Sequence, residues 1–439
     1  MSVPADRPTR RARPNVVVFF TDQQRWDSLG LHGNPLDLTP NLDRMARRGT
    51  HVPLAFTAQP VCAPTRASLQ TGLYPTTSGV YRNNVRLPET TRTLAHHFGD
   101  AGYRTGYIGK WHLADRDPVP PDQRGGYEYW LAANMLEFQS DAYRATLFDN
   151  DGVVRHLPGY RADAMGDAAI RYVDDHARHH ADEPFFLFLS FLEPHHQNHQ
   201  DAYPAPTGYA ERYAGRWTPP DLAALGGSAP QHLPGYWGMV KRLDEVLGRL
   251  LDALTSLGLL DDTIVAFTTD HGCHFKTRNS EYKRSPHDAS IRVPLAFQGP
   301  GFDGGGQIGQ LVSLIDLPPT LLDAAGLAVP PEMQGRSILP LLRGERAGWP
   351  EEVFVQISES GVGRAIRTHG WKYSVVAPGL DGWDHAGADR YVEECLYDLG
   401  ADPYELVNLA GADAFAEVAA DLRARLIRRM VEALSLIHI

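Results

Sequence analysis

One stretch near the start of the chain reads Val16-Val17-Val18-Phe19-Phe20-Thr21-Asp22-Gln23. Its five apolar, β-forming residues predict a strand, and the strand ends abruptly in polar residues. Three further runs of this kind follow along the chain, at Thr105–Ile108, Phe185–Phe191 and Ile264–Thr268. Because helical patterns separate these runs, the sequence predicts an α/β fold with a doubly wound sheet flanked by helices.

Helices and a second unit are expected from the spacing of apolar residues. A period near 3.6 predicts helices at Thr39–Arg48, Ala162–His179 and Tyr236–Leu257. After Gly335 the pattern changes to short strands, at Val353–Ser358, Gly363–Thr368, Lys372–Val376 and Cys395–Asp398, followed by a helix from Ala414 to Leu434. We therefore expect a large domain over residues 14–340 and a smaller C-terminal α+β subdomain, an antiparallel sheet plus a helix, over residues 341–439. Residues 1–13, rich in Arg and Pro, predict a disordered N-terminal arm.

Composition excludes several classes of function. The 439 residues include 42 basic and 53 acidic side chains, a net charge of −11, so a basic nucleic-acid-binding surface is not expected. Apolar stretches are too short for a membrane span or a signal peptide, which predicts no membrane partner. Three cysteines cannot form a disulfide framework, and a cytoplasmic, reducing location is expected. Only five of the basic residues are lysines.

Each of the four predicted strands ends in a cluster of polar residues. The clusters are Thr21-Asp22-Gln23, Gly109-Lys110-Trp111-His112, Glu193-Pro194-His195-His196 and Thr269-Asp270-His271-Gly272. Ligands of open α/β sheets bind in the crevice beyond the carboxyl ends of the strands. A single Asp after a strand is more often a helix N-cap, but four such clusters together predict one site.

Two of these clusters suit a metal ion. Asp22 and Asp270 offer hard carboxylate oxygens, and Gln23 and His271 are neutral additional ligands. This set predicts one divalent cation, Ca²⁺ by the hardness of the oxygens, with Mn²⁺ as the alternative because of the imidazole.

A cysteine stands at the start of a further predicted helix, Pro60–Gly72. Pro64 fits a first helical turn and Gly72 fits a helix end, which places Cys62 at the helix N-terminus. Backbone N–H groups there favour anions, and Arg66 adds a bidentate donor. On these residues alone, Cys62 is either a nucleophile or a small buried side chain, the commoner role of a single cysteine.

Four segments carry a family resemblance. Cys62-Ala63-Pro64-Thr65-Arg66 resembles the C-x-P-x-R signature of the sulfatase family, and residues 102–112 resemble the second signature of that family. Asp270-His271-Gly272 with residues 290–295, and the stretch from Leu396 to Leu409, resemble two further blocks. The resemblance implies the alkaline-phosphatase-like fold, with a catalytic domain over residues 14–340.

The resemblance also implies a mechanism. A maturation enzyme would convert Cys62 to Cα-formylglycine, whose hydrate is the nucleophile, and the cation would be held by Asp22, Gln23, Asp270, His271 and the modified residue 62. The resemblance implies further roles. Arg66 would hold the hydrate, and Lys110 and Lys283 would contact the sulfate. His195 and Lys283 would be acids beside the leaving oxygen, and His112 would be the base for sulfate release. His195 is favoured over His196 because it directly follows Pro194. Two positions depart from the common pattern: Gln23 replaces a second Asp, and Thr65 replaces Ser.

Polar loops indicate the class of substrate. The predicted substrate contacts are His196, His274, Arg278 and His287. Hydrogen-bonding side chains suit a sugar sulfate better than a hydrophobic aryl sulfate, and the expected substrate is a small-molecule or oligosaccharide sulfate ester. Two alternatives remain: a phosphonate or phosphate ester hydrolase with the same site, and a glycan-binding protein in which Cys62 stays unconverted.

Overall fold

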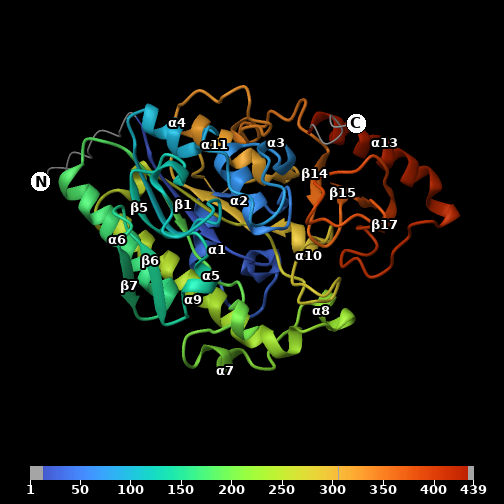
Figure 1. Cartoon of the computed structure of the whole chain (residues 1–439), viewed down its shortest axis with the longest axis horizontal. Helices are drawn as coiled ribbons and strands as arrows, with labels where there is room; N and C mark the ends of the chain where they lie inside the picture. Colours follow the sequence, from blue (N-terminus) through green and yellow to red (C-terminus); the bar gives the residue numbers. More distant parts are fainter. Residues whose placement is uncertain (1–12, 305, 434–439) are drawn as a thin grey trace, which may run out of the picture.

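A computed structural model describes residues 13–304 and 306–433, and its centre is a ten-stranded sheet (Figure 1). The strands in spatial order are β12 (Gly306–Gln307), β2 (Thr50–His51), β11 (Leu295–Gln298), β9 (Thr263–Thr269), β1 (Asn15–Thr21), β8 (Phe185–Ser190), β4 (Arg104–Lys110), β5 (Tyr129–Ala133), β6 (Arg144–Phe148) and β7 (Val154–Pro158). The five strands from β9 to β5 are mutually parallel. Antiparallel pairs extend the sheet beyond β9 and β5. The predicted doubly wound mixed sheet is confirmed.

Strand β1 shows why the sheet is covered on both faces. Val16, Val18 and Phe20 belong to the hydrophobic cluster on one face, which includes α2 (Cys62–Thr71), α4 (Leu94–Asp100) and α11 (Leu317–Ala324). Val17 and Phe19 alternate with them and pack on the other face with α1 (Pro40–Arg48), α6 (Arg161–His179) and α9 (Ala229–Ser256). Figure 1 shows these two helical layers on opposite sides of the sheet. Side chains that alternate along the strand therefore pack into two separate hydrophobic cores.

Short elements connect this framework. The shorter helices are α3 (Pro75–Ser78), α5 (Leu136–Gln139), α7 (Tyr209–Tyr213), α8 (Pro220–Leu225), α10 (Asp288–Ile291) and α12 (Leu339–Leu342). A three-stranded sheet comprises β10 (Arg292–Val293), β3 (Ala55–Phe56) and β13 (Val312–Ser313). Within the described residues, no helix is both long enough and apolar enough to cross a membrane.

The C-terminal unit, drawn in orange and red in Figure 1, is a second antiparallel sheet with one helix. Its strands are β14 (Glu352–Ile357), β15 (Gly363–Thr368), β16 (Trp371–Val376) and β17 (Val392–Asp398), and its helix is α13 (Ala416–Glu432). Leu422 and Leu426 of α13 pack on Ile366 and Leu396 of the sheet. The predicted α+β composition is confirmed, whereas the boundary at residue 340 stays a prediction. The predicted arm, apart from Arg13, and the predicted helix end at Leu434 lie outside the described residues.

Two predicted boundaries are wrong by three or more residues. Helix α9 begins at Ala229 rather than Tyr236 and contains Pro234. Ala229 and Leu233 are buried in a hydrophobic cluster, and this packing stabilises the first part of the helix. Packing thus offsets the destabilising effect of the internal Pro234. Strand β17 begins at Val392 rather than Cys395, because its pairing with β16 continues through a register shift beside Ser374.

Candidate active site

The four polar clusters meet at one edge of the sheet. Their strands, β9, β1, β8 and β4, are parallel neighbours, so their carboxyl ends lie side by side. The Gln23 backbone N–H donates to Asp270 Oδ1 at 2.9 Å, and the Asp22 N–H donates to the Glu193 carbonyl at 3.1 Å. Lys110 Nζ lies 2.9 Å from Asp22 Oδ2. The clusters therefore form a single buried site, as the strand ends predicted.

Helix α2 places Cys62 at this edge. Cys62 is the first residue of α2, and the helix ends at Gly72, whose φ of 72° suits glycine. The Cys62 side chain is buried, and its Sγ lies 3.4 Å from His271 Nε2, 3.7 Å from Asp22 Oδ1 and 2.8 Å from Lys283 Nζ. The thiol thus lies where two strand ends and a distant loop converge.

Arg66, one turn along α2, links the helix to three strands. Its guanidinium donates to Asp22 Oδ2 at 2.9 Å, to the Lys110 carbonyl at 2.7 Å and to Ser190 Oγ at 2.8 Å. Burial raises the pKa of Asp22, yet Lys110, His195 and Arg66 outweigh it and hold that pKa well below its usual value. Asp22 is therefore an ionised carboxylate in the interior.

Opposing influences act on the Cys62 thiol. Burial and the Asp22 carboxylate raise its pKa, but Lys110, Lys283 and His271 outweigh them, and the net pKa falls to about 6. The position therefore stabilises negative charge on the atom attached to Cβ of residue 62.

The donor set fits a divalent cation. One ligand atom from each of Asp22, Cys62, Asp270 and His271 lies within 4.8 Å of the others. Asp270 Oδ2 and Gln23 Oε1 are buried, and neither accepts a hydrogen bond from the described residues. Burial and the Asp22 carboxylate raise the pKa of Asp270 to about 7. Two close carboxylates with an oxygen left unpartnered are the arrangement that a bound cation would relieve.

Lys283 connects His195 to the Cys62 cluster. Lys283 Nζ lies 3.0 Å from His271 Nε2 and 3.3 Å from His195 Nε2, and burial lowers the pKa of His195 well below its usual value. The His195 ring stacks on His196 at 4.3 Å, and His196 contacts Tyr282 at 4.4 Å. His196 therefore extends the polar wall outward from His195.

Glu137 is a member of the site for which the sequence carries no signal, since it is a single acid on the short helix α5. Its Oε1 lies 3.0 Å from Lys110 Nζ and 3.9 Å from His112 Nδ1. Neither ring nitrogen of His112 has a hydrogen-bond partner in the described part of the chain. Burial lowers the pKa of His112 to about 4 despite Glu137, so the ring is neutral at pH 7.

Three predicted substrate contacts have other partners. His274 Nε2 contacts the Lys283 carbonyl at 3.0 Å, and Arg278 donates to the carbonyls of Tyr404 and Glu405 at 2.9 and 2.8 Å. His287 Nε2 lies 3.1 Å from the Tyr397 hydroxyl. These side chains anchor the loop that carries Lys283, partly against the C-terminal unit, instead of joining the Cys62 cluster.

Comparison with known proteins identifies the family. The profile of the family described as Sulfatase matches residues 14–327. The chain belongs to the sulfatase family. As a sulfatase, it is a sulfuric ester hydrolase. A second profile, described as N-sulphoglucosamine sulphohydrolase, C-terminal, matches residues 281–432 of the sulfatase.

Relatives match over nearly the whole sulfatase. An ulvan-active sulfatase of Formosa agariphila is 31% identical over 97% of this chain and 82% of its own. Human N-acetylgalactosamine-6-sulfatase is 27% identical over 96% of this chain and 86% of its own. The crystal structure of a putative sulfatase from Bacteroides fragilis superposes with a TM-score of 0.83 at 24% identity, covering 99% and 98% of the two chains. The last comparison confirms the fold.

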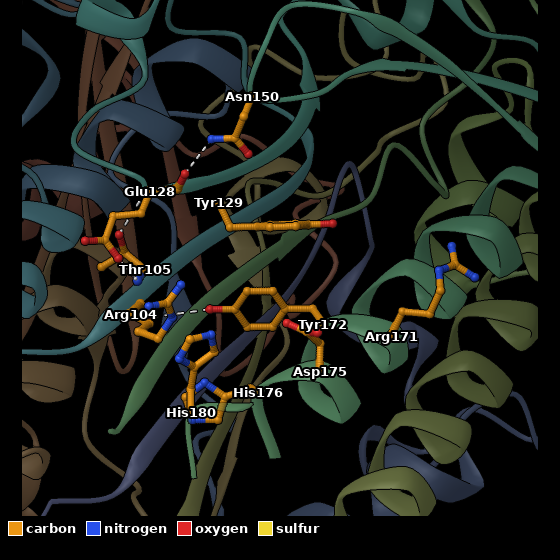
Figure 2. A pocket seen from close by; sticks show the side chains of 10 residues that line it. All are labelled: Arg104, Thr105, Glu128, Tyr129, Asn150, Arg171, Tyr172, Asp175, His176 and His180. Carbon is orange, nitrogen blue, oxygen red and sulfur yellow. Dashed lines mark hydrogen bonds between the residues drawn. The ribbon is translucent and has the colours of Figure 1, made fainter. Parts of the chain in front are cut away.

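A separate pocket of the sulfatase lies away from this site (Figure 2). Arg104 and Thr105, at the amino end of β4, line it, whereas Lys110 at the carboxyl end of that strand belongs to the Cys62 cluster. The rings of Tyr129 and Tyr172 face the pocket, with their centres 5.0 Å apart. Its position at the opposite edge of the sheet excludes a direct part in chemistry at Cys62.

The low pKa of Cys62 predicts selective reactivity in unconverted, chelator-treated sulfatase. Iodoacetamide should alkylate Cys62 with a rate that rises through about pH 6 and then levels off, because the thiolate is already formed. Burial raises the pKa of Cys273 to about 11 and that of Cys395 to about 12, so these two cysteines are internal controls and should stay unmodified. Peptide mass spectrometry measures all three rates. A Cys62 rate still climbing above about pH 8, as for an ordinary thiol, would contradict the electrostatics described.

Proposed function

We propose that the protein hydrolyses sulfate esters of sugars, with a formylglycine hydrate made from Cys62 as nucleophile and one divalent cation, Ca²⁺ or Mn²⁺, as cofactor. The observation that carries this proposal is the position of Cys62 Sγ among Asp22, His271 and Lys283 at the N-terminus of α2. The aldehyde hydrate supplies two hydroxyls on one carbon, one to attack sulfur and the other to expel sulfate.

The chain's own residues support each part of this chemistry. The cation would be held by Asp22, Gln23, Asp270 and His271, and when bound it neutralises negative charge on the sulfate oxygens. Arg66 Nε has no hydrogen-bond partner among the described residues and would donate to the hydroxyls at position 62. Lys110 holds Asp22 ionised, and Lys283, next to both Cys62 and His195, offers a cation for the sulfate.

Three residues are candidates for proton transfer. Lys283, 2.8 Å from Cys62 Sγ, and His195, 3.3 Å from Lys283 Nζ, are the acid candidates beside the leaving group. His112, buried and neutral with both ring nitrogens unpartnered, is suited to accept a proton from the hydroxyl at position 62. Glu137, 3.9 Å from His112 Nδ1, would stabilise the resulting imidazolium.

A sugar substrate is supported by polar side chains next to His196 and by the names of the relatives. Tyr282 donates to Asp201 Oδ1 at 2.6 Å, and Lys276 Nζ lies 2.9 Å from Asp201 Oδ2, next to the His196 ring. Such polar side chains suit a leaving group rich in hydroxyls. The names of the relatives specify ulvan and N-acetylgalactosamine 6-sulfate as sources of their substrates. The maturation enzyme and a cytoplasmic location stay predictions.

Metal binding at this site can be measured without turnover. Ca²⁺ or Mn²⁺ should raise the free energy of unfolding of the wild-type protein, measured in urea, by about 2.7 kcal/mol at 100 times the dissociation constant. Asp270→Asn should weaken binding by at least about 10-fold in calorimetry, because it removes one of two carboxylates. Exposed Asp182→Asn is the matched control and should bind like wild type. Equal stabilisation of wild type and Asp270→Asn by the cation would contradict the proposed ligand set.

The substrate class is tested with matched esters. Protein made together with a maturation enzyme should have a kcat/KM on an aryl sulfate more than about 10-fold above that on the phosphonate of the same alcohol. A panel of sulfated mono- and oligosaccharides should then contain a better substrate than the aryl sulfate. A preference for phosphonate would favour the phosphonate or phosphate ester hydrolase. Saccharide binding without any turnover would favour the non-catalytic glycan-binding protein.

A further inference from the structure

A loop next to the nucleophile forms one margin of the site. Asn83 Oδ1 accepts a hydrogen bond from the Ala63 backbone N–H at 3.0 Å, directly beside Cys62. The Asn83 N–H in turn donates to Glu359 Oε1 at 2.7 Å. Residues 81–84 are therefore fixed between the first turn of α2 and the C-terminal unit, and we call them the rim loop.

Arg82 is the charged residue of the rim loop. Its Nη1 donates to the Asn83 carbonyl at 3.0 Å, and its guanidinium lies 5.8 Å from the ring centre of Trp383 and 5.7 Å from that of Tyr81. Trp383 belongs to the segment between β16 and β17 and is fixed to the rim loop, because the Tyr81 hydroxyl donates to its carbonyl at 3.3 Å. The Arg82 side chain is half-buried and held by two aromatic rings.

The charge of Arg82 is not cancelled. Within the described residues, no carboxylate forms an ion pair with Arg82. Its neighbour across Trp383, Arg284, lies 2.6 Å from Glu359 Oε2 and 3.3 Å from Glu281 Oε1. Arg66, deeper in the site, is paired with Asp22. Of these three arginines, only Arg82 presents a guanidinium without an acidic partner, and its neighbour Asn83 accepts a hydrogen bond from Ala63, next to Cys62.

We propose that Arg82, held against Trp383, binds a second anionic group of the substrate, a carboxylate or a further sulfate on the saccharide whose sulfate ester is cleaved. This inference rests on the proposed function and narrows its substrate class to saccharides with more than one anionic group. A guanidinium presents two parallel N–H donors that match either anion, and the flanking rings limit its rotamers before binding. Arg82 is a specificity residue, since the reacting atoms lie with Cys62 and the cation ligands.

The test compares three saccharides sulfated at the same position: one with no other charge, one with an added carboxylate and one with an added sulfate. Wild type should prefer at least one charged saccharide in kcat/KM. Arg82→Ala should lower the ratio of kcat/KM for that saccharide to kcat/KM for the neutral one by about 10- to 100-fold, the range for a charged hydrogen bond. Arg82→Lys should retain part of the ratio, and raised ionic strength should reduce it in wild type. The two charged saccharides distinguish carboxylate from sulfate recognition.

Arg86→Ala is the matched control. Arg86 lies four positions along the chain, is exposed and is already paired with Glu89 at 2.8 Å, so its replacement should leave the ratio unchanged. Arg82→Gln replaces Arg82→Ala if the latter has a lowered unfolding midpoint. An equal loss on all three saccharides, or a wild type that prefers the neutral one, would overturn the inference. Failure of wild type to cleave any sulfate ester would instead refute the proposed function.

Discussion

The Asp22 carboxylate, buried at the end of the central strand β1, is the constraint on which the site depends. An ionised carboxylate is costly to bury without partners, and here Arg66 and Lys110 each approach Asp22 Oδ2 to 2.9 Å. Because Asp22 needs both cationic partners, the start of α2 lies beside the end of β1, and the end of β4 lies beside α2 and β1. The same requirement sets Cys62, one turn before Arg66, against the remaining Asp22 oxygen. The position of Cys62, the proposed nucleophile, thus follows from neutralising one buried charge.

Positive charge in this acidic protein is local. The chain carries a net charge of −11, yet its substrate is an anion. Three cationic side chains lie around Cys62: Lys110, Lys283 and Arg66. Burial strengthens their electrostatic interaction with an anion at this position. The C-terminal unit supports the loops around the site. It accepts hydrogen bonds from Arg278 on the Lys283 loop, and its Trp383 lies against Arg82 of the rim loop. The two units therefore build the site together, although the proposed nucleophile and cation ligands all come from the large sheet and its helices.

Local patterns predicted the framework, and long-range contacts account for what they missed. The central strands and their polar ends could be predicted because an apolar run followed by Asp22 or Asp270 is visible within a few residues. Glu137 could not, because only the fold brings its single carboxylate to Lys110 and His112. The loop position of His287 predicts a substrate contact, but its ring contacts the hydroxyl of Tyr397, more than 100 residues later. Sequence proximity to Lys283 could not distinguish side chains that face the site from those that anchor the loop.

In the proposed mechanism residue 62 acts as an aldehyde hydrate, and the mass of its tryptic peptide shows whether the aldehyde is present. Preparations of the protein with and without a maturation enzyme should be compared in both peptide mass and sulfatase turnover. Turnover per chain should rise in proportion to the fraction of residue 62 present as formylglycine and vanish in its absence. Full turnover from protein whose Cys62 remains an unmodified thiol would contradict the proposed role of the hydrate.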